Sequence, residues 1–193
     1  MADIDVRGGG ATATAPGQGH EDGGGRGRGP SPVVAGVLLG VGFGGFVDGI
    51  VLHQVLQWHH MLTSTGDNPA DTVAGLEANT VADGLFHMAT WLFLVAGVVV
   101  LRKAWASGRP APRWPAQLGA MMIGWGLFNL VEGIVDHHLL NVHDVRDDVA
   151  DPLWWNLGFL AFGAVLVLAG LALVRGATAR GGTTQDVSDA RGG

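Results

Sequence analysis

The chain has 193 residues, a formal net charge of −6 at pH 7, 15% charged residues and 48% hydrophobic residues. Its mean hydropathy of +0.31 is unusual for a soluble domain and typical of a protein embedded in a membrane. The negative charge argues against a nucleic-acid partner, and the lack of cysteine excludes disulfides, thiolate metal ligands and a thiol nucleophile.

Four apolar stretches predict an all-α integral membrane protein. The predicted spans are about 33–60, 81–103, 116–143 and 153–175. Each is at or above the roughly 20 residues that cross a bilayer. The ends of the chain, 1–32 and 176–193, are rich in glycine and small polar residues, which predicts disordered tails.

The first span carries glycine at every fourth position: Gly36, Gly40 and Gly44. This spacing lets membrane helices approach closely. It serves either packing within the chain or packing between copies in a homo-oligomer, and the sequence leaves both open.

The end of the first span is repeated in the third. Residues 48–60 read DGIVLHQVLQWHH, and residues 132–143 read EGIVDHHLLNVH. The alignment pairs Asp48 with Glu132, His53 with His137, Gln57 with Asn141, and His59 with His143. A repeat selected for packing alone would keep apolar residues and glycines, whereas this one also keeps side chains that bind metals or move protons.

The second and fourth spans also resemble each other, because AGVVVLR at 96–102 matches AGLALVR at 169–175. The chain is therefore predicted to be a four-helix bundle made of two tandem helical hairpins. Hairpins in the same orientation predict a pseudo-twofold axis along the membrane normal.

The distribution of lysine and arginine predicts the orientation in the membrane. Basic residues gather in the two tails and in the loop that contains Arg102, Lys103, Arg109 and Arg113. The other two loops, about 61–80 and 144–152, hold one basic residue against seven acids. Both termini are therefore expected in the cytoplasm, with the repeated motif at the outer side of the membrane.

Ionisable residues near the outer ends of the spans form the candidate site, because they avoid lipid by facing each other. The predicted metal-binding set is Asp48, His53, His59, His60, Asp83, His87, Glu132, Asp136, His137, His138 and His143. Regular α-helix geometry would place His53, Gln57 and His60 on one face of the first span. It would place Asp48 and His59 on another face. On the fourth span, Asn156 and Leu160 stand where the second span has Asp83 and His87.

Histidine and carboxylate without sulfur suit copper, iron or zinc, with manganese also compatible, and do not choose among them. A haem held between spans by two histidines is an open alternative. Three classes of function follow. They are a metal-dependent membrane oxidoreductase, a carrier or assembly factor that delivers metal to a respiratory complex, and a structural or proton-relay membrane protein without metal.

Three motifs, GFGGFVDGIVLHQVLQWHHML, DGLFH at 83–87 and GLFNLVEGIVDHHLL, resemble the domain-of-unknown-function 2243 family of predicted bacterial membrane proteins. The resemblance covers about residues 35–175. It implies a four-span protein of the bacterial plasma (inner) membrane and supplies no activity. It also implies an aspartate where this chain has Asn156, so a carboxylate role on the fourth span is not expected here.

Overall fold

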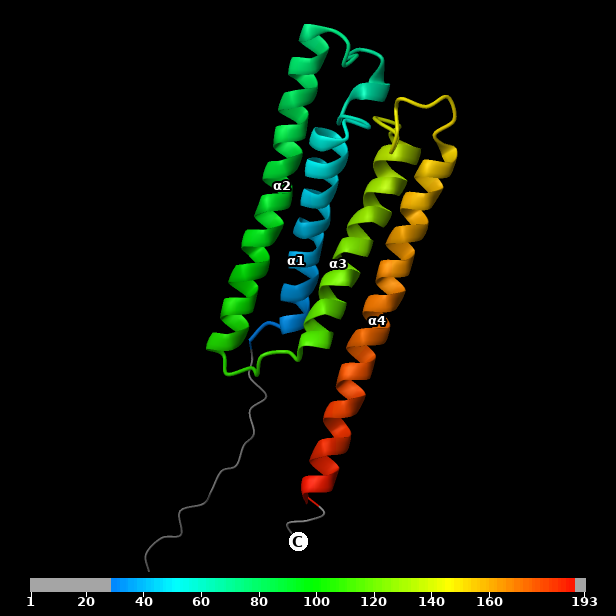
Figure 1. Cartoon of the computed structure of the whole chain (residues 1–193). Helices are drawn as coiled ribbons and strands as arrows, with labels where there is room; N and C mark the ends of the chain where they lie inside the picture. The colour runs from blue at the N-terminus through cyan, green and yellow to red at the C-terminus, as the bar shows by residue number, and fades with distance from the viewer. Residues whose placement is uncertain (1–28, 190–193) are drawn as a thin grey trace, which may run out of the picture.

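A computed structural model describes residues 29–189, which form four long helices and contain no strand. The helices are α1 (Pro32–Val47), α2 (Val73–Ala106), α3 (Trp114–Ile134) and α4 (Leu153–Asp189). Short π-helical segments continue two of them: η1 (Asp48–Val55) follows α1, and η3 (Val135–Leu139) follows α3. Counted with these continuations, the four helices are each long and apolar enough to cross a membrane (Figure 1). The predicted all-α, four-span class is therefore confirmed.

The predicted tails are only partly covered by the structure. Residues 1–28 and 190–193 lie outside the described residues, and α4 is helical as far as Asp189. The helix starts follow ordinary capping rules. Ser31 precedes Pro32 and accepts a hydrogen bond from the Val33 amide at 3.2 Å, and Thr72 caps α2 through the Gly75 amide at 3.1 Å.

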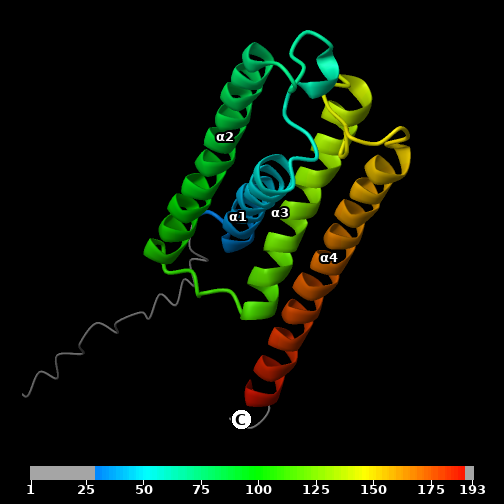
Figure 2. The ribbon, with the colours of Figure 1, turned by 45° about the horizontal axis from the view of Figure 1, so that its top comes forward.

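The helices stand in the order α2–α1–α3–α4, with the main packing contacts between neighbours in that row (Figures 1 and 2). The central helices are the more buried ones. In the most apolar window of each span, 44% of the first and 39% of the third are buried, against 11% and 17% of the second and fourth. The outer helices α2 and α4 therefore present most of the lipid-facing surface.

The centre of the row is a close contact between α1 and α3 that depends on glycine. A Cβ at Gly40 would strike the carbonyl oxygen of Met121, and a Cβ at Gly124 would strike that of Val37. Two further glycines of α1 also face α3: Gly36 lies against Ala120, and Gly44 lies against Trp125. The predicted glycine stripe thus packs within the chain. Gly40 and Gly124 are repeat equivalents that make reciprocal contacts, as the predicted twofold axis requires.

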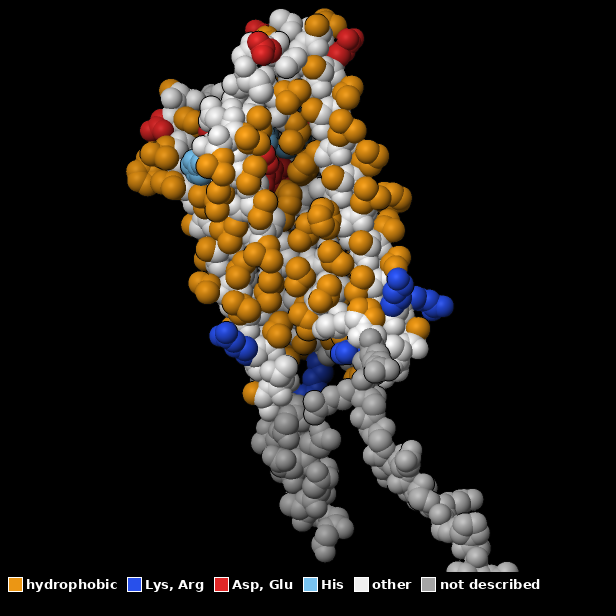
Figure 3. All heavy atoms as spheres, turned by 180° about the vertical axis from the view of Figure 1, so that it is seen from behind, with side chains coloured by type: hydrophobic (Ala, Val, Ile, Leu, Met, Phe, Trp, Pro, Cys, Tyr) orange, Lys and Arg blue, Asp and Glu red, His pale blue; other side chains and the backbone are white. Residues whose placement is uncertain are grey.

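The face seen in Figure 3 is broadly hydrophobic along its middle (the hydrophobic belt), with opposite charges at its two ends. Lysine and arginine side chains gather at one end, and acidic side chains at the other. Within the belt, acidic and histidine atoms are visible at the bottom of a recess. Polar groups of the repeated motif therefore lie inside the apolar part of the molecule.

Candidate metal centre

The π-helical segments bring the acid and the first histidine of each motif together. In η1 and η3 the backbone bonds run from residue i to i+5, as in Leu56 N–H to Val51 O at 2.8 Å and Leu140 N–H to Val135 O at 2.7 Å. This wider turn places residues five apart on nearly one face. As a result Asp48 Oδ2 lies 3.1 Å from His53 Nε2. The α-helical faces expected from the sequence were wrong here, because the helix is not an α-helix through the motif.

A chain reversal brings the second histidine of each motif back to the same place. Gln57 and Asn141 have positive φ angles of 51° and 50°, and each ends its helix in the left-handed conformation. The repeated amide therefore has a backbone role, and both side chains are exposed. The reversal returns His59 and His143 toward the core, where their exposed fractions are 2% and 0%.

Six buried side chains form the centre, three from each repeat, and none is more than 4% exposed. They are Asp48, His53, His59, Glu132, His137 and His143. Their potential ligand atoms form three overlapping triads in which all atoms lie within 4.8 Å of one another. The rings of His59 and His143 are stacked, with centroids 4.6 Å apart and planes 8° apart.

Most of the polar atoms in this centre have no hydrogen-bond partner within the described part of the chain. They are both oxygens of Asp48 and Glu132, both ring nitrogens of His137 and His143, and Nε2 of His53 and His59. Burying a polar atom unpaired costs about 1–3 kcal/mol, and native proteins hold few of them. A cation bound between these atoms removes that cost, so the donor set fits a metal ion.

Outer hydrogen bonds orient two of the histidines. His53 Nδ1 donates to Asp83 Oδ1 at 3.0 Å, and His59 Nδ1 donates to the Val145 carbonyl at 2.9 Å. In both rings Nε2 is the nitrogen that faces the centre, and in a neutral His59 ring it is the unprotonated one. Metal-bound histidines are usually held in this way. Burial, and then the neighbouring His143, lower the pKa of His59 to about 3. Burial likewise lowers the pKa of His143. Both rings are therefore neutral at physiological pH, the form that binds metal.

The two outer loops close the end of the centre by bonding to each other. The amide of Asp147 donates to the Trp58 carbonyl at 2.9 Å, and its carboxylate accepts from the hydroxyls of Thr63 and Ser64. The Arg146 guanidinium lies 5.0 Å from the Trp58 ring and 4.9 Å from the Trp155 ring. Each repeat thus supplies part of the cover over the shared site.

The remaining predicted residues lie around the centre rather than in it. Asp83 is the partner of His53 and also binds His60 Nδ1 at 2.7 Å. His87 Nδ1 bonds to the Asp83 carbonyl at 2.8 Å, on its own helix. Asp136 is half-buried in a recess that it shares with Glu132, and His138 is exposed. None of these five belongs to the triads found among the described residues.

The structure explains how this chain accommodates Asn156 where the family resemblance implies an aspartate. Asp83 and Asn156 occupy equivalent places: each side chain accepts a 3.0 Å bond from a loop amide, of Met61 and Val145 respectively. Asn156 Nδ2 then donates to Asp144 at 2.6 Å, where Asp83 instead accepts from His60. Donor and acceptor of the second bond are thus exchanged between the repeats. An amide is needed at 156 because the partner at 144 is a carboxylate, which can only accept.

Sequence reasoning missed two groups beside the centre. The Val145 carbonyl could not be found, because a backbone atom leaves no residue-type signal. Asn129 on α3 is 2% exposed and its Oδ1 has no partner among the described residues. Its repeat equivalent is Gly45, so the comparison of motifs passed over it. A lone amide in the middle of an apolar span was the available signal.

Comparison with known sequences identifies one family. The family model described as "Predicted membrane protein (DUF2243)" matches residues 35–177, which is most of the chain. Searches of curated proteins and of solved structures gave no match.

Proposed function

Because the chain belongs to the DUF2243 family of predicted membrane proteins, we propose that it is a multi-pass membrane metalloprotein. The six buried side chains at the junction of the two repeats would hold a first-row transition metal such as copper, iron or zinc. The metal would serve redox chemistry in the membrane or the assembly of a metal-containing respiratory complex.

The observation that carries the proposal is the joint burial and lack of partners of these atoms. A hydrogen-bonded network of four histidines and two carboxylates would pair donors with acceptors, as native proteins do. Here both oxygens of Glu132 and both ring nitrogens of His137 are buried and unpaired within the described residues. A cation bound between such atoms would satisfy them together.

Burial also favours a resident metal over one in transit. A delivery protein must release its ion, which calls for ligands that open to solvent or to a partner. The six side chains are at most 4% exposed, and the loops above them are bonded together. We therefore place a tightly held cofactor, in an oxidoreductase or assembly role, ahead of an exchangeable cargo.

The location follows from charge. The centre lies at the acidic end of the hydrophobic belt, and the basic residues lie at the other end (Figure 3). By the positive-inside rule the metal would sit in the outer half of the plasma membrane, with both termini in the cytoplasm. When bound, the metal supplies a redox or Lewis-acid centre, while the protein fixes the imidazoles and excludes water.

The test is the metal content and absorption spectrum of the full chain purified in detergent without chelators. We expect stoichiometric metal in the wild type and its loss in the His53→Ala/His137→Ala double variant. His138→Ala is the matched control, because that histidine is exposed, and it should keep its metal. The ratio of metal to protein tells one ion from two, and a haem would show itself by its spectrum.

Folded wild-type protein that was expressed with ample metal and still held none would refute the metal proposal. The second candidate, a proton relay or a structural polar network, would then lead. One observation favours that candidate on its own: Asp83 links His53, His60 and the Met61 amide in a continuous chain of hydrogen bonds.

A further inference from the structure

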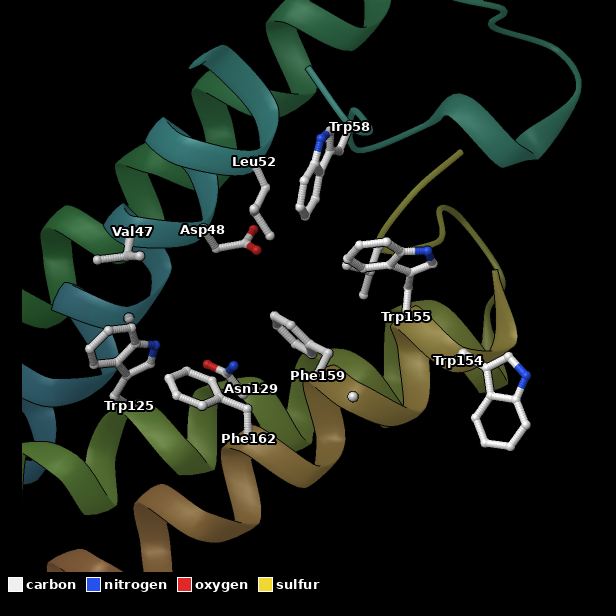
Figure 4. A pocket seen from close by; sticks show the side chains of 13 residues that line it. Val47, Asp48, Leu52, Trp58, Trp125, Asn129, Trp154, Trp155, Phe159 and Phe162 are labelled. Carbon is white, nitrogen blue, oxygen red and sulfur yellow. The ribbon is translucent and has the colours of Figure 1, made fainter. Parts of the chain in front are cut away.

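A pocket of about 550 Å³ opens beside the centre, between α1, α3 and the start of α4 (Figure 4). Its walls are mainly aromatic and include Trp58, Trp125, Trp155, Phe159 and Phe162. Most of these side chains belong to membrane spans, so the pocket lies within the apolar belt. Phe162 is 45% exposed on the lipid-facing side. A compound dissolved in the bilayer would reach the pocket without passing through water.

Two polar side chains break the apolar lining. Asp48 and Asn129 both border the pocket and are 4% and 2% exposed. Figure 4 shows the Asp48 carboxylate pointing into the space between Leu52 and Phe159. Asp48 Oδ2 lies near His53, but Oδ1 has no partner in the described part of the chain, and neither has Asn129 Oδ1. Both free atoms are acceptors, so a ligand that satisfies them must donate hydrogen bonds.

The repeat provides a natural comparison for this pocket. A smaller pocket of about 320 Å³ lies at the equivalent place in the other repeat, with Glu132 in the position of Asp48. There Asp136 replaces Leu52, and Val41 replaces Trp125. The smaller pocket therefore has two carboxylates and fewer aromatic walls. Of these two pockets, the larger has the more aromatic lining, with six Trp and Phe side chains against three Phe, and it adds the Asn129 amide to the carboxylate.

We propose that the larger pocket binds a lipid-soluble aromatic alcohol, of the phenol or hydroquinone class. The ring would lie against the aromatic walls, and the hydroxyl would donate to Asp48 and Asn129. The inference deepens the proposed function and rests on it, because Asp48 belongs both to the pocket and to the metal centre. A compound of this class would lie next to the proposed metal.

Binding can be measured with tetramethylhydroquinone as the probe, under argon, on the full chain in lipid nanodiscs. Quenching of tryptophan fluorescence reports occupancy, because several tryptophans line the pocket. The dimethyl ether of the same ring cannot donate a hydrogen bond. We expect it to bind at least about tenfold more weakly, since two buried acceptors would stay unpaired.

Gly158→Leu would add a bulky side chain at the wall of the pocket. Gly158 lines the pocket, and a Cβ there meets no atom within 4 Å. We expect it to weaken hydroquinone binding at least about tenfold while helical content and metal content stay at wild-type values. Gly84→Leu is the matched control, because a Cβ at Gly84 also meets open space and Gly84 borders none of the pockets described above. It should bind the probe as the wild type does.

The outcomes separate the two proposals. Equal binding of hydroquinone and ether, or binding unaffected by Gly158→Leu, would mean that the pocket is a groove for lipid chains and would overturn this inference. Metal retained without hydroquinone binding would overturn the inference alone. Hydroquinone bound by a protein that never holds metal would overturn the metal proposal and leave the pocket as a ligand site.

Discussion

In the first repeat, His53 donates to the carboxylate of Asp83, whereas its counterpart His137 has no hydrogen bond at either ring nitrogen within the described residues. The fourth helix offers Asn156 at the equivalent place, and that amide is engaged with Asp144 and the Val145 amide. The two repeats thus supply the same kinds of candidate ligand, but only in the first repeat is the leading histidine held by a carboxylate. A carboxylate partner also makes an imidazole a stronger donor to a metal. The pseudo-twofold symmetry sets the positions of the six central side chains, and the hydrogen-bond partners behind them differ between the two halves.

The largest effect should come from the histidines shared between triads. His53 and His143 each belong to two of the three triads. We expect His53→Ala and His143→Ala each to lower metal affinity more than about 100-fold, beyond the usual effect of an outer-layer change. Competition with a chelator of known affinity measures the loss. If one variant kept wild-type affinity, the ion would be held by the other triads only.

Asp83→Asn would make the first repeat resemble the second. The Asn side chain can still accept from the Met61 amide, but it loses the carboxylate that orients His53. We expect metal affinity to fall about 10–100-fold. Asn156→Ala is the matching change in the second repeat, and we expect little effect on metal, since Asn156 does not bond to a histidine. Equal losses from the two variants would show that the halves are held alike.

The reversed bond at Asn156 can be tested by swapping polarity. The Asn156 amide nitrogen lies 2.6 Å from Asp144 Oδ1, so Asn156→Asp would replace this hydrogen bond by a contact between two carboxylate oxygens. This substitution should lower the free energy of unfolding by about 1–3 kcal/mol. Adding Asp144→His copies the pair formed by Asp83 and His60, and should restore most of the loss. Thermal unfolding of the two variants in the same detergent gives the comparison. Additive losses in the double variant would contradict the equivalence of the two positions.

The smallest effect concerns the chain reversals. Gln57 and Asn141 share the same left-handed conformation, but asparagine tolerates it better than glutamine. Gln57→Asn should therefore stabilise the protein by about 0.5 kcal/mol, a fraction of the strain of such a residue. Asn141→Gln should destabilise it by a similar amount. Unfolding midpoints of both variants are the measurement, and a loss in the first would mean that the Gln57 side chain matters.

Much of this architecture could be predicted from the sequence, since hydropathy and the repeat act over many residues. The number of spans, the tandem hairpins and all six central side chains were among the predictions. The π-helical turn at Asp48 and the reversal at Gln57 could not be predicted, because they depend on how the outer ends of the helices and their loops pack against each other. Regular α-helical spacing would have separated Asp48 from His53, which the structure brings to 3.1 Å. The order of helices in the row and the role of Asn129 likewise depend on tertiary packing.

The reciprocal glycine contact of α1 and α3 has a consequence for how the two halves of the site can differ. A symmetric pair of identical hairpins would carry every substitution on both sides of the site at once. In a single chain the two sides are encoded separately. One half therefore carries Asn156 and Asp136 where the other carries Asp83 and Leu52.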